Sequence, residues 1–483
     1  MSVLASHPRV SRRSRPIITC LGIPEPQPEP LVGGEKIHGR ASVAIRPDDG
    51  YISAMIRRSI LPRLEQALSQ RPVVLLHGAR QTGKTTLVRS IAERNPKGRY
   101  VTLDDATLYS AAQENPAGFL AGLTATQEPL PANLVRGPSF EPVVIDEVQR
   151  VPDLFRAIKL TVDRDRRPGR FLLTGSANAL LIPKVSESLA GRMDLVNLWP
   201  LSQGEIERTQ EAFVDIIFSK GLPLRVKAEQ DSAGLFERIA RGGYPEVFSQ
   251  EPKWRSSWFE SYLTTILQRD IRDLANIEGL AMFPRLLRLL ASRAGSLLNF
   301  ADVSRGLAMP LTTLKRYFAL LEATFLVRTL PPWFTRTGQR LVKSPKIYLT
   351  DTGLMTQLLG VDQTRLARDP VFSGPLVENF VVMELIKQAT WSSTRVEMFH
   401  FRTAVGREVD IVLESPSGDL VGIEVKAGAS VKGDDLKGLD ALKEVAKSRF
   451  HRGIVLYAGQ EVVPFAADIH AVPLSALWQW SEG

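Results

Sequence analysis

A glycine-rich segment between a short apolar strand and a helix constrains this chain more than any other part of its sequence. Residues 73–85 read VVLLHGARQTGKT and contain the complete pattern G-x-x-x-x-G-K-[ST]. Gly78 and Gly83 permit backbone angles that let consecutive N–H groups converge on phosphate oxygens, and the start of the following helix adds its positive end. The segment therefore predicts a binding site for the phosphates of a nucleotide.

The residues of this loop have separate expected roles. Lys84 is expected to reach the β- and γ-phosphates, and the Thr85 hydroxyl is expected to bind Mg²⁺. We therefore predict ATP and Mg²⁺ as cofactors. The predicted nucleotide-binding residues are the consecutive positions Gly78, Ala79, Arg80, Gln81, Thr82, Gly83, Lys84, Thr85 and Thr86.

A pair of acids follows a second apolar run, as nucleotide hydrolysis requires. The segment PVVIDEVQR predicts a buried strand that ends at Asp146 and Glu147. Asp146 is expected to hold Mg²⁺ through water, and Glu147 is expected to orient or activate the attacking water. Two adjacent acids at a strand end are otherwise typical of a solvated turn, but the loop upstream favours the hydrolytic interpretation.

Two later motifs supply further candidates for contact with the transferred phosphate. The next strand, RFLLTGSAN, ends in polar residues, of which Ser176 is the first candidate and Asn178 the second. An ordinary turn explains them almost as well. Arg192, in LAGRM, is expected to stabilise charge on the phosphoryl group, either in its own subunit or in a neighbouring one. A structural surface arginine is the alternative, and a homo-oligomer is left open.

The motifs GARQTGKTTL, VVIDEVQRVPDLF, LLTGSAN, LAGRM and RGGYPEV together resemble the AAA-type (ASCE) P-loop ATPases of prokaryotes, specifically the group in which the ATPase domain precedes a domain of unknown function, DUF4143. The resemblance runs from about residue 51 to the C-terminus. It implies a parallel sheet with an extra strand between the strands that lead to Lys84 and Asp146, and helices on both faces. It leaves the cellular role open.

The positive charge of the chain is concentrated in two segments. The net charge is +9, from 61 basic and 52 acidic residues. Residues 1–46 hold seven basic and three acidic side chains, and residues 281–320 hold six basic and one acidic, so these segments contain the whole excess. A localised positive surface favours a polyanionic partner such as DNA, because neutralising phosphates supplies most non-specific affinity. A basic face that is only solvated is the alternative.

The second basic segment also carries a recognisable order of elements. Three helix-like runs, MFPRLLRLLASRAG, NFADVSRGL and PLTTLKRYFALLEATF, precede two extended stretches, FLVRTLPPW and SPKIYLTD. Asn299 is expected to cap the second helix. This order matches a winged helix-turn-helix, whose second helix and wing contact DNA. A basic helical bundle between two domains, or a protein-binding adaptor, is the alternative.

Two charged strands near the C-terminus predict a second site. In GREVDIVLE, alternation places Val409 and Ile411 on one face and Asp410 on the other. A hairpin to the strand IEVKAG then places Asp410 opposite Glu424 and Lys426. The alternative is an exposed salt bridge, which is worth under about 1 kcal/mol.

These strands, with the helix GPLVENFVVMEL before them, resemble the PD-(D/E)XK nuclease fold, although VD stands where that fold usually has PD. The resemblance implies that Asp410 and Glu424 bind Mg²⁺, that Lys426 positions or deprotonates the attacking water, and that Glu378 is an auxiliary ligand. The helix that carries Glu378 is expected to be amphipathic. Because the fold also occurs as a binding or inactive module, nuclease activity stays open.

The predicted fold class is α/β: a parallel-sheet P-loop ATPase core with a helical lid, a winged-helix module and a C-terminal α/β PD-(D/E)XK nuclease-like domain. The predicted division places a disordered basic tail at 1–50, the ATPase core at 51–210, a helical lid or linker at 211–275, a winged-helix-like module at 276–345 and a DUF4143-type nuclease-like domain at 346–483.

The remaining features concern the setting of the protein. No apolar run approaches the roughly 18–20 residues needed to cross a bilayer, and Cys20 is the one cysteine of the chain. These observations favour a reducing, cytoplasmic location without membrane partners. We predict an ATP-hydrolysing conformational switch that acts on or near DNA. The alternatives are a nucleotide-regulated protein-binding switch with an inactive nuclease fold, and an ATP-dependent nuclease.

Overall fold

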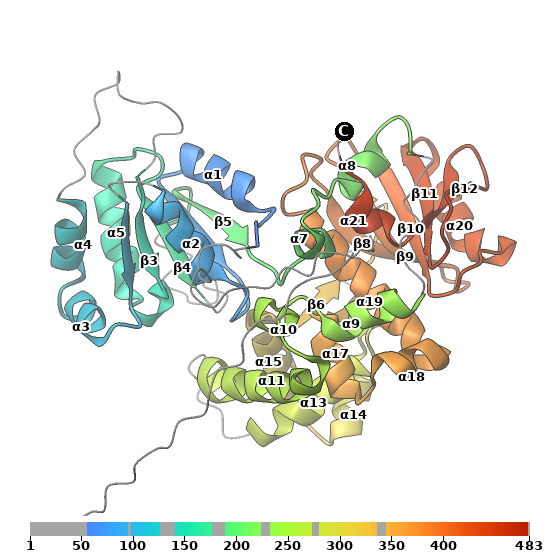
Figure 1. Cartoon of the computed structure of the whole chain (residues 1–483), viewed down its shortest axis with the longest axis horizontal. Coiled ribbons are helices and arrows are strands. Elements are labelled where there is room, and N and C mark those ends of the chain that lie inside the picture. The colour runs from blue at the N-terminus through green and yellow to red at the C-terminus, as the bar shows by residue number, and fades with distance from the viewer. Residues whose placement is uncertain are drawn as a thin grey trace, which may run out of the picture. The chain divides into compact units, whose positions relative to one another are not determined.

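The computed structural model describes residues 56–94, 98–125, 141–175, 189–223, 232–272, 280–335 and 344–481 (Figure 1). The chain divides into two units, Met1–Met55 and Ile56–Gly483, and all described residues belong to the second. The predicted basic tail at 1–50 therefore lies outside the described residues.

Five strands of the first half form a parallel sheet in the order β2-β3-β4-β1-β5. They are β1 (Val73–His77), β2 (Arg99–Thr102), β3 (Val143–Asp146), β4 (Phe171–Gly175) and β5 (Met193–Asn197). β4 lies between β1, which leads to Lys84, and β3, which ends at Asp146. The prediction of a parallel sheet with this extra strand is confirmed.

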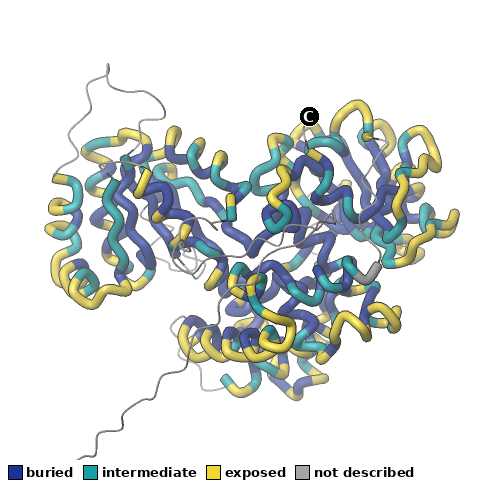
Figure 2. Tube along the Cα trace, in the orientation of Figure 1, coloured by how far each residue is buried: buried dark blue, intermediate teal, exposed yellow. Residues whose placement is uncertain are grey.

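Helices cover both faces of this sheet because its strands are apolar on both sides. They are α1 (Leu61–Gln70), α2 (Lys84–Glu93), α3 (Ala106–Glu114), α4 (Pro116–Thr124) and α5 (Asp153–Arg164). Val73 and Leu75 belong to the apolar cluster that contains α5 residues, whereas Val74 and Leu76 belong to the cluster of α1 and α2. Alternate residues of a strand point to opposite faces, so both faces bury apolar surface, as the dark strands of Figure 2 show.

Helices dominate the region after the sheet. They are α7 (Gln203–Glu207), α8 (Phe213–Phe218), α9 (Ser232–Arg241), α10 (Pro245–Phe248) and α11 (Pro252–Thr265). A π-helical segment, Ile266–Ile271, continues α11 directly. π-Helical segments are rare in proteins, and those that occur are often found at functional sites.

Three helices cover the second basic segment, and an antiparallel strand pair follows them in the chain. The elements are α13 (Phe283–Ala291), α14 (Phe300–Leu307), α15 (Leu311–Ala323), β6 (Val327–Leu330) and β7 (Lys346–Leu349). The Asn299 side chain accepts hydrogen bonds from the backbone N–H groups of Ala301 and Asp302, so the predicted cap is confirmed. The winged-helix prediction rests on this order of elements. Two helices follow, α17 (Thr352–Leu359) and α18 (Gln363–Arg368).

The C-terminal part contains a six-stranded mixed sheet in the order β12-β13-β11-β10-β9-β8. Its strands are β8 (Glu397–Arg402), β9 (Glu408–Glu414), β10 (Leu420–Lys426), β11 (Phe450–Tyr457), β12 (Val463–Pro464) and β13 (Ile469–Pro473). β9 and β10 are antiparallel neighbours, with Ile411 opposite Ile423, so the predicted hairpin is confirmed. The helices of this part are α19 (Pro370–Gln388), α20 (Lys437–Ala446) and α21 (Ala476–Gln479).

A bulge in β9 changes which face its first residues occupy. Phe399 of β8 is opposite Val412, but Phe401 is opposite Val409, so two residues of β9 stand where β8 has one. Val409 therefore packs in the cluster that contains Val412 and α20 residues, whereas Ile411 packs in the other. The prediction that Val409 and Ile411 share a face was wrong, because a bulge shifts the alternation of a strand.

The helix that carries Glu378 differs from its sequence expectation. In α19, every residue from Asn379 to Gln388 is buried, and the apolar ones belong to the large cluster that also contains Ile411 and Ile423. The expectation of an amphipathic helix was wrong, because this helix packs against protein on all sides rather than on one stripe. Among the described residues, none of the helices is both long and apolar enough to span a bilayer.

Candidate functional site

The phosphate loop lies at the carboxyl end of β1 and adopts a conformation that its glycines make possible. Gly83 has φ +90° and directly precedes α2, and Gln81 has φ 60°. A Cβ atom on Gly78 would lie 2.1 Å from the Leu198 carbonyl oxygen, because the chain after β5 pairs with His77 at this point. Gly78 is therefore required by a close approach of backbone, and Gly83 by a left-handed conformation.

Lys84 turns its side chain back into the loop. Its Nζ donates hydrogen bonds to the carbonyl oxygens of Gly78, at 3.0 Å, and Ala79, at 2.7 Å. The residue is 5% exposed, and burial lowers the pKa of its ammonium group to about 8. An anionic phosphate in the loop would favour the charged form of this group.

Thr85 and Asp146 are brought together, as the sequence predicts for a magnesium site. The Thr85 hydroxyl donates to Asp146 Oδ2 at 2.7 Å, and the Tyr100 hydroxyl donates to the same oxygen at 2.8 Å. The Thr174 hydroxyl donates to Asp146 Oδ1. A hydroxyl beside a carboxylate is the donor set that Mg²⁺ takes in nucleotide sites, so these residues fit the ion. Sequence reasoning missed Tyr100 and gave Thr174 no role.

Glu147 is held beside this pair in an uncommon conformation. Its φ is 59°, which costs a non-glycine residue of the order of 1–3 kcal/mol. Its backbone N–H donates to Thr174 Oγ1 at 3.1 Å, and the Gln149 side chain donates to Glu147 Oε2 at 2.5 Å. Thr174 thus fixes both acids at once, and strain of this kind clusters at functional sites.

Of the other two predicted catalytic residues, only Arg192 lies within the described residues. Ser176, like Asn178, lies outside the described residues. Arg192 pairs with Asp163 of α5 at 2.6 Å, and its carbonyl accepts the N–H of Val73 at the start of β1. It therefore lies at the amino end of the sheet, roughly 15 Å of strand away from the loop. This position is incompatible with a role in its own subunit, and a role in a neighbouring subunit stays a prediction.

Two arginines connect the phosphate loop to later parts of the chain, and sequence reasoning missed both connections. Arg80 Nε lies 2.6 and 2.7 Å from the two carboxylate oxygens of Asp270, in the π-helical segment. Arg58 donates to the carbonyl oxygens of Thr82 and Trp199, both at 2.7 Å, and pairs with Glu205 at 3.1 Å. No local pattern reveals these contacts, because their partners lie 24 to 190 residues away.

The C-terminal strands bring most of the second predicted site together. Asp410 of β9 and Glu424 of β10 are neighbours, and Asp410 Oδ2 accepts the N–H of Val425 at 3.0 Å. Burial and the nearby Asp410 raise the pKa of Glu424 to about 10 and that of Glu378 to about 7. Lys426 Nζ lies 3.9 Å from Glu424, in the range of a weak ion pair.

A second lysine, which sequence reasoning assigned only to a wing strand, occupies the centre of this acidic cluster. Lys346 of β7 lies 2.6 Å from Glu408, 2.9 Å from Glu378 and 3.1 Å from Asp410. Burial alone would lower its pKa, but the three carboxylates outweigh this effect and raise it. Over the described part of the chain, no group of three or more His, Cys, Asp or Glu side chains is arranged to hold a metal ion.

Comparison with known proteins finds three family models that match successive parts of the chain. Residues 70–207 match the family model for an AAA domain, 232–365 match a domain of unknown function (DUF8612), and 373–477 match another (DUF4143). The uncharacterized protein Rv2008c of Mycobacterium tuberculosis is 33% identical over 458 residues, which are 94% of this chain and 90% of that protein. The chain belongs to the Rv2008c family. Protein Mb2031c of Mycobacterium bovis matches equally well.

The AAA domain of this Rv2008c-family protein contains the loop and acids described above, which supports ATP binding and hydrolysis. Among solved structures, AMPPCP-bound DnaA from Aquifex aeolicus matches at 14% identity over 57% of this chain and 90% of that chain, with a TM-score of 0.25. A score this low does not indicate a shared overall fold.

Proposed function

We propose that this protein is a Mg²⁺-dependent ATPase whose hydrolysis cycle works as a conformational switch on or near DNA. The observation that carries the proposal is the convergence of Lys84, Thr85, Asp146 and Glu147 at the carboxyl ends of β1 and β3. Thr85 and Asp146 would hold the magnesium, which neutralises phosphate charge when bound. Lys84 would bind the phosphates, and the Glu147 carboxylate would orient the attacking water and accept its proton.

The Arg80–Asp270 pair supplies a route from the loop to the helical region. Arg80 belongs to the loop that would surround the phosphates, and its side chain is 20% exposed in the pair with Asp270. A bound triphosphate would compete with Asp270 for this cation. The strength of the contact would then differ between the nucleotide-bound and the free states, and such a differential contact is what shifts a conformational equilibrium.

Asp270→Asn is expected to tighten ATP binding about tenfold, because it frees Arg80 for the phosphates and removes a charge-assisted hydrogen bond of about 1.5 kcal/mol. Fluorescent-nucleotide titration measures this change. Glu246→Gln, an exposed acid of α10, is the matched control and should bind ATP like the native chain. Unchanged or weaker ATP binding by Asp270→Asn would contradict the coupling between the phosphate loop and Asp270. It would leave the ATPase assignment unaffected.

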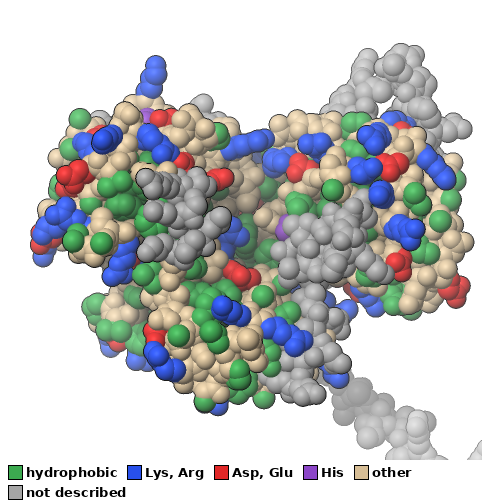
Figure 3. All heavy atoms as spheres, turned by 180° about the vertical axis from the view of Figure 1, so that it is seen from behind, with side chains coloured by type: hydrophobic (Ala, Val, Ile, Leu, Met, Phe, Trp, Pro, Cys, Tyr) green, Lys and Arg blue, Asp and Glu red, His purple; other side chains and the backbone are tan. Residues whose placement is uncertain are grey.

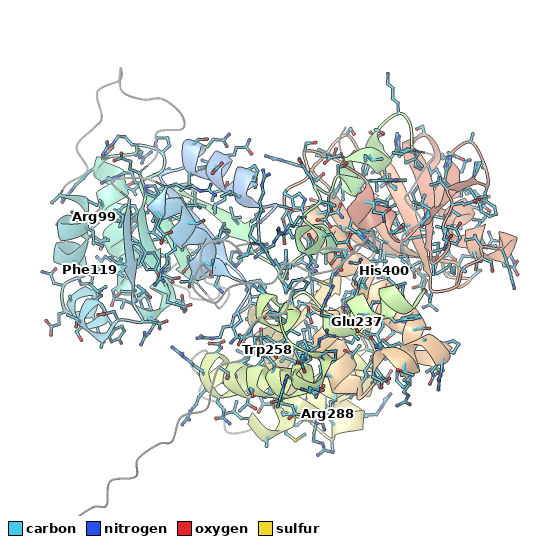
Figure 4. The ribbon with its side chains drawn as sticks, viewed as in Figure 1. Arg99, Phe119, Glu237, Trp258, Arg288 and His400 are labelled. Carbon is cyan, nitrogen blue, oxygen red and sulfur yellow. The ribbon has the colours of Figure 1, made fainter. Side chains whose placement is uncertain are left out.

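A basic surface on α13, α14 and α15 supports DNA as the partner of the switch. Its exposed cations are Arg285, Arg288, Arg305, Lys315 and Arg316. Arg288 lies on α13 (Figure 4), and Figure 3 shows lysine and arginine side chains over the helical region seen from behind. Arg305 has an acidic partner, Asp302, one turn away. Exposed cations of this kind suit the phosphate backbone of a duplex.

Phosphate release with and without duplex DNA tests the whole proposal. We expect DNA to stimulate release, and we expect DNA affinity to fall steeply with salt. Replacing Arg285, Arg288 and Arg316 with Gln should lower the salt slope by about one for each phosphate that is no longer neutralised. Arg156→Gln, an exposed residue of α5, is the control. Absent or salt-independent binding would favour the protein-binding switch instead.

A further inference from the structure

The Lys346 ammonium lies among the carboxylates of the C-terminal acidic cluster, two of which are predicted metal ligands. Glu408, Glu378 and Asp410 each place a carboxylate oxygen within 2.6 to 3.1 Å of its Nζ. An ammonium group has three protons to donate, so three carboxylates satisfy it completely. The Lys346 side chain is 2% exposed, and the cation is therefore held by protein groups rather than by water.

The cluster also has donors other than Lys346. Asp410 Oδ2 accepts the backbone N–H of Val425 at 3.0 Å, and the Tyr348 hydroxyl donates to Glu378 Oε1 at 2.7 Å. Mg²⁺ needs oxygens at about 2.0–2.1 Å in an octahedral arrangement. To take Asp410 Oδ1 and Glu378 Oε1 as ligands, it would have to displace the ammonium from both.

The backbone of Lys346 is held in place by strand pairing, which limits how far its ammonium group can move out of the cluster. It is paired with Leu330 in the β6–β7 ladder and forms an isolated bridge with Leu297. Withdrawing the ammonium without a replacement would leave three partly buried carboxylates close together without a cation, which is unfavourable. Keeping it in place would put a divalent ion within a few ångströms of another cation, which is unfavourable too.

We propose that Lys346 is a built-in cation that replaces the divalent metal of the C-terminal cluster, so that the native chain binds neither Mg²⁺ nor Mn²⁺ there. The predicted ligands Asp410 and Glu378 then have a structural role, because they fix β7 and α19 to the sheet through Lys346. On this inference, the C-terminal module does not work as a metal-dependent nuclease. This inference is independent of the ATPase proposal.

Mn²⁺ binding, followed by electron paramagnetic resonance without nucleotide, tests the inference. The native chain and Asp410→Asn are expected to bind the same number of Mn²⁺ ions at millimolar metal. Lys346→Met keeps an apolar stem and removes the charge, so it is expected to bind one additional ion. That ion should be lost again when Asp410→Asn is combined with Lys346→Met. Lys346→Arg keeps a cation in the cluster and should bind no additional ion.

Three results would overturn the inference. The first is a Mn²⁺ ion bound by the native chain and lost in Asp410→Asn. The second is a Lys346→Met chain that has native circular dichroism but binds no extra Mn²⁺. The third is Mg²⁺-dependent DNA cleavage by the native chain that Asp410→Ala or Lys426→Ala abolishes. If Lys346→Met does not fold, the comparison of the native chain with Asp410→Asn decides the question alone.

Discussion

Glu147→Gln is expected to lower the rate of ATP hydrolysis about 10²–10⁴-fold, the usual contribution of a positioned general base. The amide has the size and hydrogen-bonding reach of the carboxylate but cannot accept the proton of the attacking water. Nucleotide affinity should stay near that of the native chain, because in the proposed site Lys84 and the backbone of the loop, rather than Glu147, would bind the phosphates. Phosphate release and nucleotide titration measure the two quantities separately.

Two further variants make this result interpretable. Glu93→Gln changes an exposed acid at the end of α2 and should leave turnover unchanged. Lys84→Ala removes the phosphate-binding cation and should abolish binding as well as turnover. Native turnover in Glu147→Gln or in Lys84→Ala would refute the assignment of this site. Weakened binding in Glu147→Gln would show that Glu147 contributes to the fold of the loop, not only to the reaction.

Arg58→Ala is expected to destabilise the protein by about 3–5 kcal/mol, since removing one partner of a buried ion pair leaves the other charge uncompensated. The Arg58 and Glu205 side chains are 8% and 1% exposed, so solvent cannot replace the lost cation. The same substitution removes the hydrogen bond to the Thr82 carbonyl in the phosphate loop. We therefore expect weaker ATP binding together with the loss of stability. Urea unfolding measures the stability, and nucleotide titration measures the ATP affinity.

The neighbouring Arg57 is exposed and provides a matched control. Arg57→Ala should have the stability and ATP affinity of the native chain. Arg58→Lys keeps a positive charge but cannot serve the separated acceptors Thr82, Trp199 and Glu205, so its stability should lie between that of Arg58→Ala and the native chain. A loss of less than about 1 kcal/mol in Arg58→Ala, the range of an exposed pair, would show that the contact is not a buried ion pair.

The placement of Arg192 and of Val409 shows where local sequence patterns reach their limit. Both predictions used sound local patterns: an arginine after a glycine, and alternation along a strand. Arg192 nevertheless precedes β5 and therefore lies at the amino end of the sheet. Val409 changes face because β9 has one residue more than β8 across a bulge. Each outcome depends on a neighbouring strand, which a local pattern does not contain.

The sequence by itself determined the nucleotide loop, the acids at the end of β3 and the β9–β10 hairpin. These features depend on short-range rules: glycines at fixed spacing, apolar runs, and alternation within a few residues. Only the tertiary structure decided that Arg58 and Asp270 hold the loop and that Lys346 fills the acidic cluster. The physical reason is that a buried charge is stabilised by whichever opposite charge the fold brings within about 3 Å, and that partner can lie anywhere in the chain.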